Sequence, residues 1–188
     1  MIPLICEELK IDKNELTARL GGARDEVSLS VAERLLKELQ PLVEPCFCFA
    51  ECPVSSENGI CDFGFAKTES KDLANVLKNH KTACLIAVTL GHAADRFIKA
   101  KALISPLEHF VADAVASALT EAACDYAVTK LPFKTGNRFS AGYGDLDLSF
   151  QKPLLDYLKT YCGCNIYLNS SGLMIPTKSI TAITVIES

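Results

Sequence analysis

The sequence predicts an α/β protein of the α+β type, in which helices flank a β-sheet. Residues 25–39 and 106–123 carry apolar side chains at helical spacing. Residues 83–90 (ACLIAVTL) form a continuous apolar run of strand length, and residues 180–186 alternate between two faces as a strand does. The chain has 188 residues, about the length of one domain. We therefore expect a single domain over residues 1–188.

Residues 1–80 are expected to form N-terminal helices and a hairpin. Asp12 followed by Glu15, with Gly21 further on, predicts a short capped helix over residues 12–20 at the periphery of the fold. The amphipathic helix at 25–39 should end before Pro41. The other predicted elements of this part are two aromatic-rich strands at 43–50 and 60–66 around the turn-forming run SSENG, and a helix at 70–78.

Residues 80–188 are expected to hold the centre of the sheet and its main helices. The apolar run 83–90 predicts a strand buried on both faces. Residues 130–147 lose all periodicity and contain several glycines, which predicts a loop of the kind that carries binding groups. The remaining predictions are helices at 91–102, 106–123 and 149–161, and strands at 166–168 and 180–186.

Composition excludes several classes of protein. The net charge is −4 and the pI about 5.4, so there is no basic footprint for a nucleic-acid backbone. No apolar run approaches the roughly 20 residues that a membrane span needs. The amino terminus, MIPLICEELKID, lacks a basic segment followed by a long apolar one and is no secretory signal. We therefore expect a cytoplasmic protein that binds neither nucleic acid nor membrane.

Nine cysteines are present. Their odd number and the missing secretory signal favour reduced thiols over a disulfide framework. Two C-x-C pairs, Cys46 with Cys48 and Cys162 with Cys164, would each share a face if both segments were strands. The C-x-x-C spacing of common metal sites occurs nowhere. We expect small buried apolar side chains; a thiol- or metal-sensing protein is the alternative.

Familiar catalytic motifs are missing. There is neither a G-x-G-x-x-G nor a Walker loop, and the three histidines show no metal-like or nucleophile-like spacing. The run Ser170-Ser171-Gly172 lacks the upstream glycine of a serine hydrolase elbow. Nucleotide hydrolysis and serine hydrolase chemistry are therefore not expected.

The loop over residues 137–145 (NRFSAGYGD) is the strongest candidate site. Arg138 can grip a carboxylate with its planar fork, while Gly142 lets the backbone approach a ligand and Tyr143 adds a phenol. This combination suits a small ligand that bears a carboxylate. In the structural alternative, Arg138 forms a surface ion pair, Gly142 and Gly144 supply positive φ angles, and Tyr143 packs on the sheet.

This loop resembles the activation (reactivation) domain of vitamin B12-dependent methionine synthase. The family's mark R-x-x-x-G-Y is met by Arg138, Gly142 and Tyr143, and short stand-alone relatives have R-F-S-P-G-Y-G-D followed by a helix containing glutamine. The family's later motif M-x-P-x-K-S-[VI]-[ST]-A is matched by residues 174–182 (MIPTKSITA). The resemblance covers residues 80–188 well and residues 1–80 in outline. It implies a twisted, mostly antiparallel sheet flanked by helices.

The family binds S-adenosylmethionine and caps a corrinoid on a neighbouring domain, so that cob(II)alamin is reduced and trapped by methylation. The resemblance implies a stand-alone activation subunit that docks on a cobalamin-carrying methionine synthase or related corrinoid methyltransferase. The chain would be a component of that methyltransferase activity, acting with its partner in trans, with a flavodoxin- or ferredoxin-like electron donor. In the alternative, the chain is a non-catalytic docking partner of a corrinoid protein and binds no S-adenosylmethionine.

The resemblance also implies roles for individual residues. Arg138 would pair with the carboxylate of the ligand, and the loop backbone would bind its adenosyl or amino group. Tyr143 would face the corrin ring near the cobalt, and two acids on the helix 106–123 would offer negative charge to the ammonium or sulfonium. The expected ligand-site residues are Arg138, Phe139, Ser140, Ala141, Gly142, Tyr143, Glu121 and Asp113.

Overall fold

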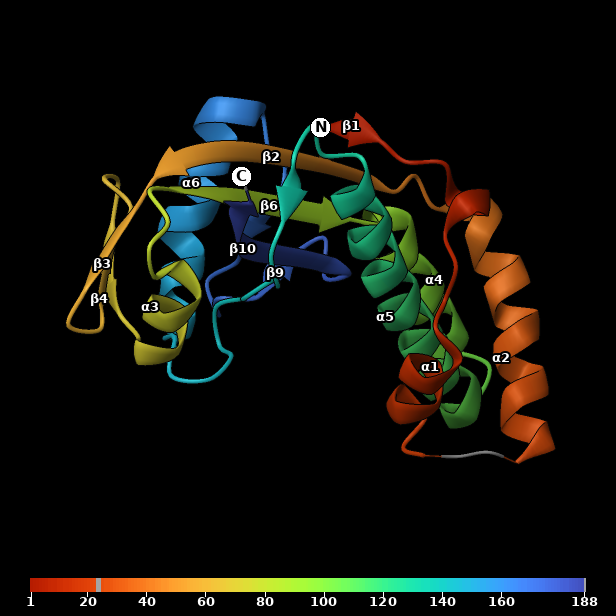
Figure 1. Ribbon diagram of the computed structural model, residues 1–188. Coiled ribbons are helices and arrows are strands. Elements are labelled where there is room, and N and C mark those ends of the chain that lie inside the picture. The colour runs from red at the N-terminus through yellow and green to blue at the C-terminus, as the bar shows by residue number, and fades with distance from the viewer. Residues whose placement is uncertain (23–24, 188) are drawn as a thin grey trace.

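The computed structural model describes residues 1–22 and 25–187. Its largest sheet is antiparallel throughout, in the order β1-β2-β6-β10-β7. Figure 1 shows the long strands of this sheet running side by side with a twist. The expected twisted antiparallel sheet flanked by helices is thereby confirmed. The strands are β1 (Ile2–Pro3), β2 (Cys46–Pro53), β6 (Thr82–Thr89), β10 (Ser179–Glu187) and β7 (Lys134–Thr135).

Strand β6 is the centre of this sheet, as its apolar run predicts. It pairs with β2 along its whole length and with β10 on its other edge. Alternate residues point to opposite faces, and each face of β6 is covered. Cys84, Ile86 and Val88 lie in one apolar cluster, whereas Leu85 and Ala87 lie in the other. A strand covered on both faces has no position left for a polar solvent-facing residue.

Helices form the two covering layers (Figure 1). Those of the first layer are α1 (Lys13–Arg19), α2 (Glu26–Leu39), α4 (His92–Ala102) and α5 (Pro106–Thr129). Those of the second layer are α3 (Lys71–Leu77) and α6 (Gln151–Cys162). Short 3-10 turns lie at Cys6–Glu8, Gln40–Leu42 and Leu148–Phe150. Helix α5 continues beyond the predicted residue 123, because alanines and other small side chains stay buried to Ala127.

The predicted caps explain where the helices begin. Asp12 accepts from the N–H groups of Asn14 and Glu15, which satisfies donors that a helix start leaves free. Asp25, Ser70 and Ser105 cap α2, α3 and α5 in the same way. The helix predicted over residues 149–161 was expected to be capped by Ser149, which is wrong, since Asp147 accepts from Ser149 N–H and α6 begins after a 3-10 turn.

Two small antiparallel sheets extend from the second layer. One is formed by β3 (Ser55–Glu57), β4 (Ile60–Asp62) and β5 (Lys67–Glu69), and the other by β8 (Tyr167–Leu168) and β9 (Met174–Ile175). The predicted strand at 60–66 is therefore wrong beyond Asp62. There the chain turns, because the Asp62 carboxylate accepts from the N–H of Gly64, whose φ is 77°.

The second C-x-C pair does not lie on a strand, so the condition under which its two thiols would share a face is not met. Cys162 ends α6 and Gly163 follows in the left-handed conformation, with φ 64°, which is the usual conformation after a helix C-terminus. Cys164 comes after this turn. Cys46 and Cys48 do lie on one strand, β2.

The buried alanines of α5 provide a test of this packing. Ala116 is fully buried in the first-layer cluster, so Ala116→Leu should lower the stability by about 1–3 kcal/mol through overpacking. Thermal unfolding followed by circular dichroism should show a midpoint lower by about 2–4 °C per kcal/mol. Ala100→Leu, at an exposed position of α4, is the control and should change the midpoint little. Equal midpoints for the two variants would contradict the packing.

Candidate functional site

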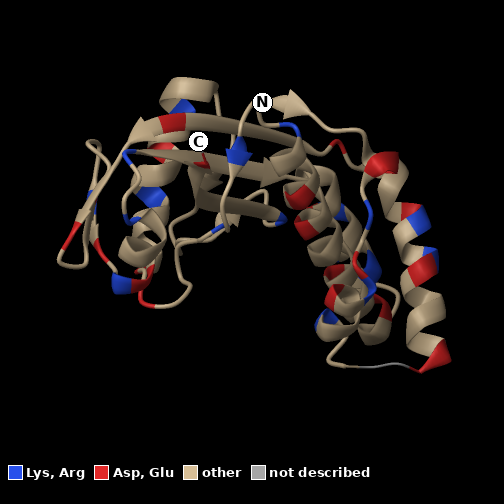
Figure 2. Ribbon diagram, in the orientation of Figure 1, with Lys and Arg blue, Asp and Glu red and all other residues tan. Residues whose placement is uncertain are grey.

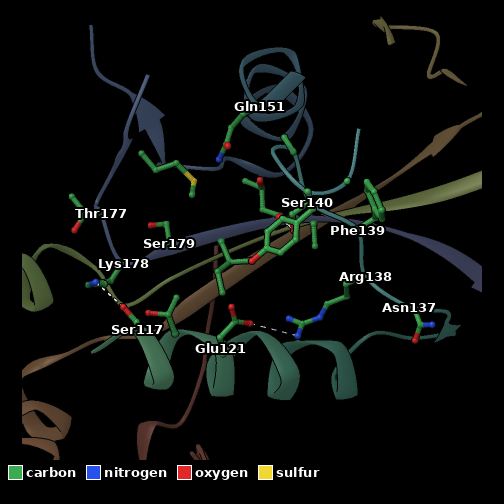
Figure 3. A pocket seen from close by; sticks show the side chains of 18 of the residues that line it. Ser117, Glu121, Asn137, Arg138, Phe139, Ser140, Gln151, Thr177, Lys178 and Ser179 are labelled. Atoms are coloured by element: carbon green, nitrogen blue, oxygen red, sulfur yellow. Dashed lines mark hydrogen bonds and ion pairs between the residues drawn. The ribbon is translucent and has the colours of Figure 1, made fainter. Parts of the chain in front are cut away.

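A cavity of about 850 Å³ lies between α5, the strand β10 and the loop over residues 137–144. Figure 3 shows α5 below the cavity and β10 crossing behind it, with the first residue of α6, Gln151, on the far side. The cavity has the size of clefts that hold small organic ligands. Because its lining comes from segments far apart in the sequence, the cavity exists only in the folded chain.

The loop over residues 137–144 is held along the edge of β10 that does not pair with β6. Phe139 and Ile183 exchange both backbone hydrogen bonds, at 2.8 and 2.7 Å, and Ser140 Oγ donates to the carbonyl of Thr181 at 2.7 Å. Before this bridge, β7 pairs with the end of β10. The prediction of an irregular loop over 130–147 is thus wrong in part, because exposed backbone groups of β10 align its first half as an interrupted edge strand.

Four side chains of α5 form a stripe along one side of the helix: Asp113, Ser117, Glu121 and Asp125. Residues four apart lie above one another on a helix, and Figure 2 shows acidic positions recurring along α5. The stripe therefore presents a row of negative charge to whatever packs against it.

Cations from three distant segments pair with this stripe. Lys178 Nζ lies 2.8 Å from Asp113 Oδ1 and donates to Ser117 Oγ at 2.8 Å. Arg138 Nη2 lies 2.6 Å from Asp125 Oδ1 and 3.7 Å from Glu121 Oε2, and Arg19 Nη2 lies 3.2 Å from Glu121 Oε1. These pairs connect the loop, the residue before β10 and α1 to one helix.

The expected site residues are brought together around this cavity, with two exceptions. Its lining includes Glu121, Arg138, Phe139, Ser140, Ala141 and Tyr143. Asp113 lies outside the lining, is 55% exposed and is paired with Lys178. Gly142 also lies outside it and turns the loop, with φ 88° and its N–H bound to the carbonyl of Leu146.

The loop partly fits the structural alternative. Arg138 is ion-paired, and Gly142 and Gly144 have positive φ angles of 88° and 53°. Tyr143, however, does not pack on the sheet, because its side chain is 66% exposed. An exposed tyrosine at the mouth of a cavity is available to a ligand or a partner surface.

Glu121 is the acid most affected by its surroundings. Burial raises the pKa of its carboxyl above the usual range, and the nearby Arg138 and Arg19 oppose this rise. Its side chain is 29% exposed, so the carboxylate is partly desolvated while it remains within reach of a ligand. A cationic group in the cavity would replace some of the lost hydration.

Several residues that line the cavity were not expected from the sequence: Arg19, Ser117, Thr120, Gln151, Thr177 and Lys178. Helix α1 was expected to be peripheral, yet its Arg19 reaches Glu121. No local pattern marks Arg19, because its partner lies on a distant helix. Lys178 falls within the M-x-P-x-K-S motif, which is a signal that could have found it.

The second half of the loop is fastened to α3 by one carboxylate. Asp145 accepts from Ser70 Oγ and from the backbone N–H groups of Lys71 and Asp72. Asp72 also lies against Gly144, so that a side chain at Gly144 would collide with its carboxylate. These contacts fix the direction in which Tyr143 leaves the loop.

Cys124 of α5 is buried beside Arg138, whereas a group of three other cysteines lies in the second layer. Cys48 of β2 packs with Cys164 and Cys162 in the second-layer cluster. A hydrogen bond with Cys48 lowers the pKa of the Cys164 thiol below its usual range. Within residues 1–22 and 25–187, no group of three or more His, Cys, Asp and Glu side chains has an arrangement that could hold a metal ion. Over the same residues, no helix is long and apolar enough to span a membrane.

No protein-family model and no curated protein matches the chain. Among solved structures, the chain is similar to the MetH reactivation domain bound to AdoHcy, with a TM-score of 0.72 and 15% identity. The superposition covers 98% of this chain and 77% of that one. The chain has the fold of the MetH reactivation domain. The fold implied by the resemblance to the methionine synthase activation domain is thereby confirmed, also for residues 1–80, which fit that family only in outline by sequence.

The attachment of the loop through Asp145 can be tested by the pH dependence of stability. The hydrogen bonds from Ser70, Lys71 and Asp72 lower the pKa of Asp145, so they stabilise the fold above the unfolded-state pKa and are lost as the pH falls through the folded-state pKa. Asp145→Ala should lower the unfolding midpoint at pH 7. The difference in unfolding midpoint between Asp145→Ala and the unmodified protein should disappear as the pH drops below about 4.

The control for this prediction is Glu57→Ala, which removes an exposed carboxylate of β3. It should leave the midpoint nearly unchanged at both pH values. A gap for Asp145→Ala that stayed constant down to pH 2 would contradict the account.

Proposed function

We propose that the chain is an activation subunit that binds S-adenosylmethionine in this cavity and docks on a cobalamin-carrying methionine synthase or a related corrinoid methyltransferase. The observation that carries the proposal is the cavity itself, where Arg138 and Glu121 meet beside an open loop backbone in the fold of a domain solved with AdoHcy. A ligand with a carboxylate, an ammonium and a sulfonium needs one cation and nearby anions, and both are present.

Arg138 would bind the carboxylate of the ligand. Its guanidinium carries five donors in a planar fork, and the contacts with Asp125 and Glu121 use one nitrogen, Nη2. Apart from a contact with the buried thiol of Cys124, the remaining donors of the fork are left for a ligand carboxylate. Asp125 is 70% exposed, so its pair with Arg138 can loosen at little cost.

The loop backbone would hold the amino or adenosyl group of the ligand. The contacts would come from the residues after Phe139. The N–H of Phe139 already donates to Ile183. Among the described residues, the N–H groups of Ser140 and Ala141 have no backbone partner. In this proposal Ser140 and Ala141 therefore make the main-chain contacts, and the Phe139 side chain forms an apolar part of the wall.

The corrinoid carried by the partner supplies the nucleophile that accepts the sulfonium methyl group. The task of this chain is to hold the sulfonium in line at the mouth of the cavity and to exclude water there, which is catalysis by proximity and orientation. Tyr143 would cover the corrin face beside the transferred methyl. An electron from a flavodoxin- or ferredoxin-like donor would reduce the cobalt. No acid–base pair is needed, since no proton moves.

One observation favours the second candidate, a docking partner of a corrinoid protein that binds no S-adenosylmethionine. The charges of Arg138 and Glu121 are already paired within the chain. In that case the exposed Tyr143 and its loop would be the part in contact with the corrinoid protein, and the cavity would stay filled with water.

Binding can be measured by calorimetric titration with S-adenosylmethionine and S-adenosylhomocysteine. The unmodified protein should bind both, and Arg138→Gln should weaken both by about 10- to 100-fold, because a charge-assisted contact contributes about 1.5–3 kcal/mol. Arg96→Gln, at an exposed position of α4, is the matched control and should bind as the unmodified protein does. Equal affinities for the two arginine variants would contradict the role of Arg138, and absence of binding by the unmodified protein would favour the docking partner.

The charge of Glu121 should make the cavity prefer the sulfonium at neutral pH. S-adenosylhomocysteine has the same carboxylate and ammonium but a neutral sulfur. As the pH falls through the raised pKa of Glu121, its protonation removes the negative charge, so affinity for S-adenosylmethionine should fall more than affinity for S-adenosylhomocysteine. Titrations at several pH values in Glu121→Gln should show a ratio of affinities that no longer changes with pH. If the ratio of affinities in Glu121→Gln still changed with pH as it does in the unmodified protein, a group other than Glu121 would be responsible for the pH dependence.

A further inference from the structure

One polar side chain of the cavity remains unexplained by these contacts. Gln151 begins α6 and lies on the side of the cavity opposite the acidic stripe of α5. It is 6% exposed, and Figure 3 shows its carboxamide directed into the cavity. A long polar side chain near a helix start would ordinarily extend into solvent.

The carboxamide of Gln151 has no hydrogen-bond partner among residues 1–22 and 25–187. Its backbone N–H is satisfied by the carbonyls of Leu148 and Ser149, so the side chain is not needed to cap the helix. A glutamine carboxamide offers two donor hydrogens and an acceptor oxygen. Contacts within the protein therefore do not explain why the carboxamide is directed into the cavity, and a ligand that enters the cavity would supply its hydrogen-bond partner.

The cavity is divided by charge. Of its four charged lining residues, Glu121 belongs to the α5 stripe and the other three pair with it: Arg19, Arg138 and Lys178. The side formed by α6 and β9 instead carries Gln151 and the half-buried Met174. A ligand with one charged end and one flat neutral end fits this division, with the charged end toward α5.

We propose that Gln151 recognises the nucleobase of the ligand by pairing with the 6-amino group of adenine and the ring nitrogen beside it. A carboxamide matches this edge, since its oxygen accepts from the amino group while its NH₂ donates to the nitrogen. This inference rests on the proposed function and adds to it the residue that selects the base. Met174 provides an apolar, polarisable surface next to the base.

The inference makes an unusual prediction for stability. If the carboxamide serves the ligand, replacing it by an apolar side chain of similar size removes no hydrogen bond that supports the fold. Gln151→Leu should then unfold at the same temperature as the unmodified protein or higher when no ligand is present. A clearly lower midpoint would mean that the carboxamide supports the fold, which would overturn the inference.

The deciding experiment measures by calorimetric titration how two ligands bind to the unmodified protein and to the Gln151 variant. The two probes are S-adenosylhomocysteine and its analogue in which hydrogen replaces the 6-amino group of the base. The unmodified protein should prefer S-adenosylhomocysteine by about tenfold. Gln151→Leu should lose about tenfold in affinity for S-adenosylhomocysteine and should bind the two probes equally. Asn75→Leu, which replaces an exposed carboxamide of α3, should keep the preference.

The outcomes separate the inference from the proposed function. If the unmodified protein and Gln151→Leu bind S-adenosylhomocysteine equally well, or if both prefer it over the analogue to the same degree, Gln151 does not recognise the base while the proposed function stands. If the unmodified protein binds neither probe, the proposed function fails and the inference fails with it.

Discussion

The candidate site depends on the two edges of β10. One edge pairs with the central strand β6 from Ser179 to Val185, and the other holds Phe139 through two backbone hydrogen bonds to Ile183. Neighbouring strands lie about 4.8 Å apart, so the loop is held at a set distance from the middle of the sheet. Helix α5 packs against both β6 and β10. The cavity is the space left between a helix and a loop that are both positioned by one strand.

The charges around this cavity act in positioning more than in stability. Ion pairs between partly exposed side chains contribute about 0–1 kcal/mol each, and Asp125 and Asp113 are both more than half exposed. Their ion pairs nevertheless determine where the guanidinium of Arg138 and the ammonium of Lys178 lie along α5. A zwitterionic ligand can exchange with such pairs because little stability is lost when they loosen. The partly buried Glu121 is the exception, since its desolvation makes a cationic partner more valuable.

The parts of the fold that follow from local sequence were predicted well. The apolar run of β6, the cap at Asp12 and the helix that follows Asp25 lie where expected, because burial on both faces and helix periodicity leave marks in neighbouring residues. The alignment of Lys134–Thr135 with β10 left no such mark, since any extended segment can pair with a free strand edge. The turn after Asp62 also escaped prediction, because its hydrogen bond to Gly64 interrupts a segment with strand-like composition.

The same contrast applies to the site. The loop from Arg138 to Tyr143 could be recognised from residue types and from its resemblance to a family, because its members are adjacent in sequence. Arg19 could not be recognised in this way, and the glutamine that follows the loop in the resembling family, here Gln151, was not assigned to the site. Arg19 enters the cavity because α1 packs against α5, and Gln151 is distinguished by a carboxamide that is directed into the cavity and makes no hydrogen bond within the described residues. Both properties arise from tertiary structure.

A crystal structure of the chain grown with S-adenosylhomocysteine would show whether one ligand spans the cavity from α5 to α6. We expect density along β10, with the carboxylate at Arg138 and the base at Gln151. Density for the ligand elsewhere on the surface, or a cavity that contains water at saturating ligand, would contradict this expectation.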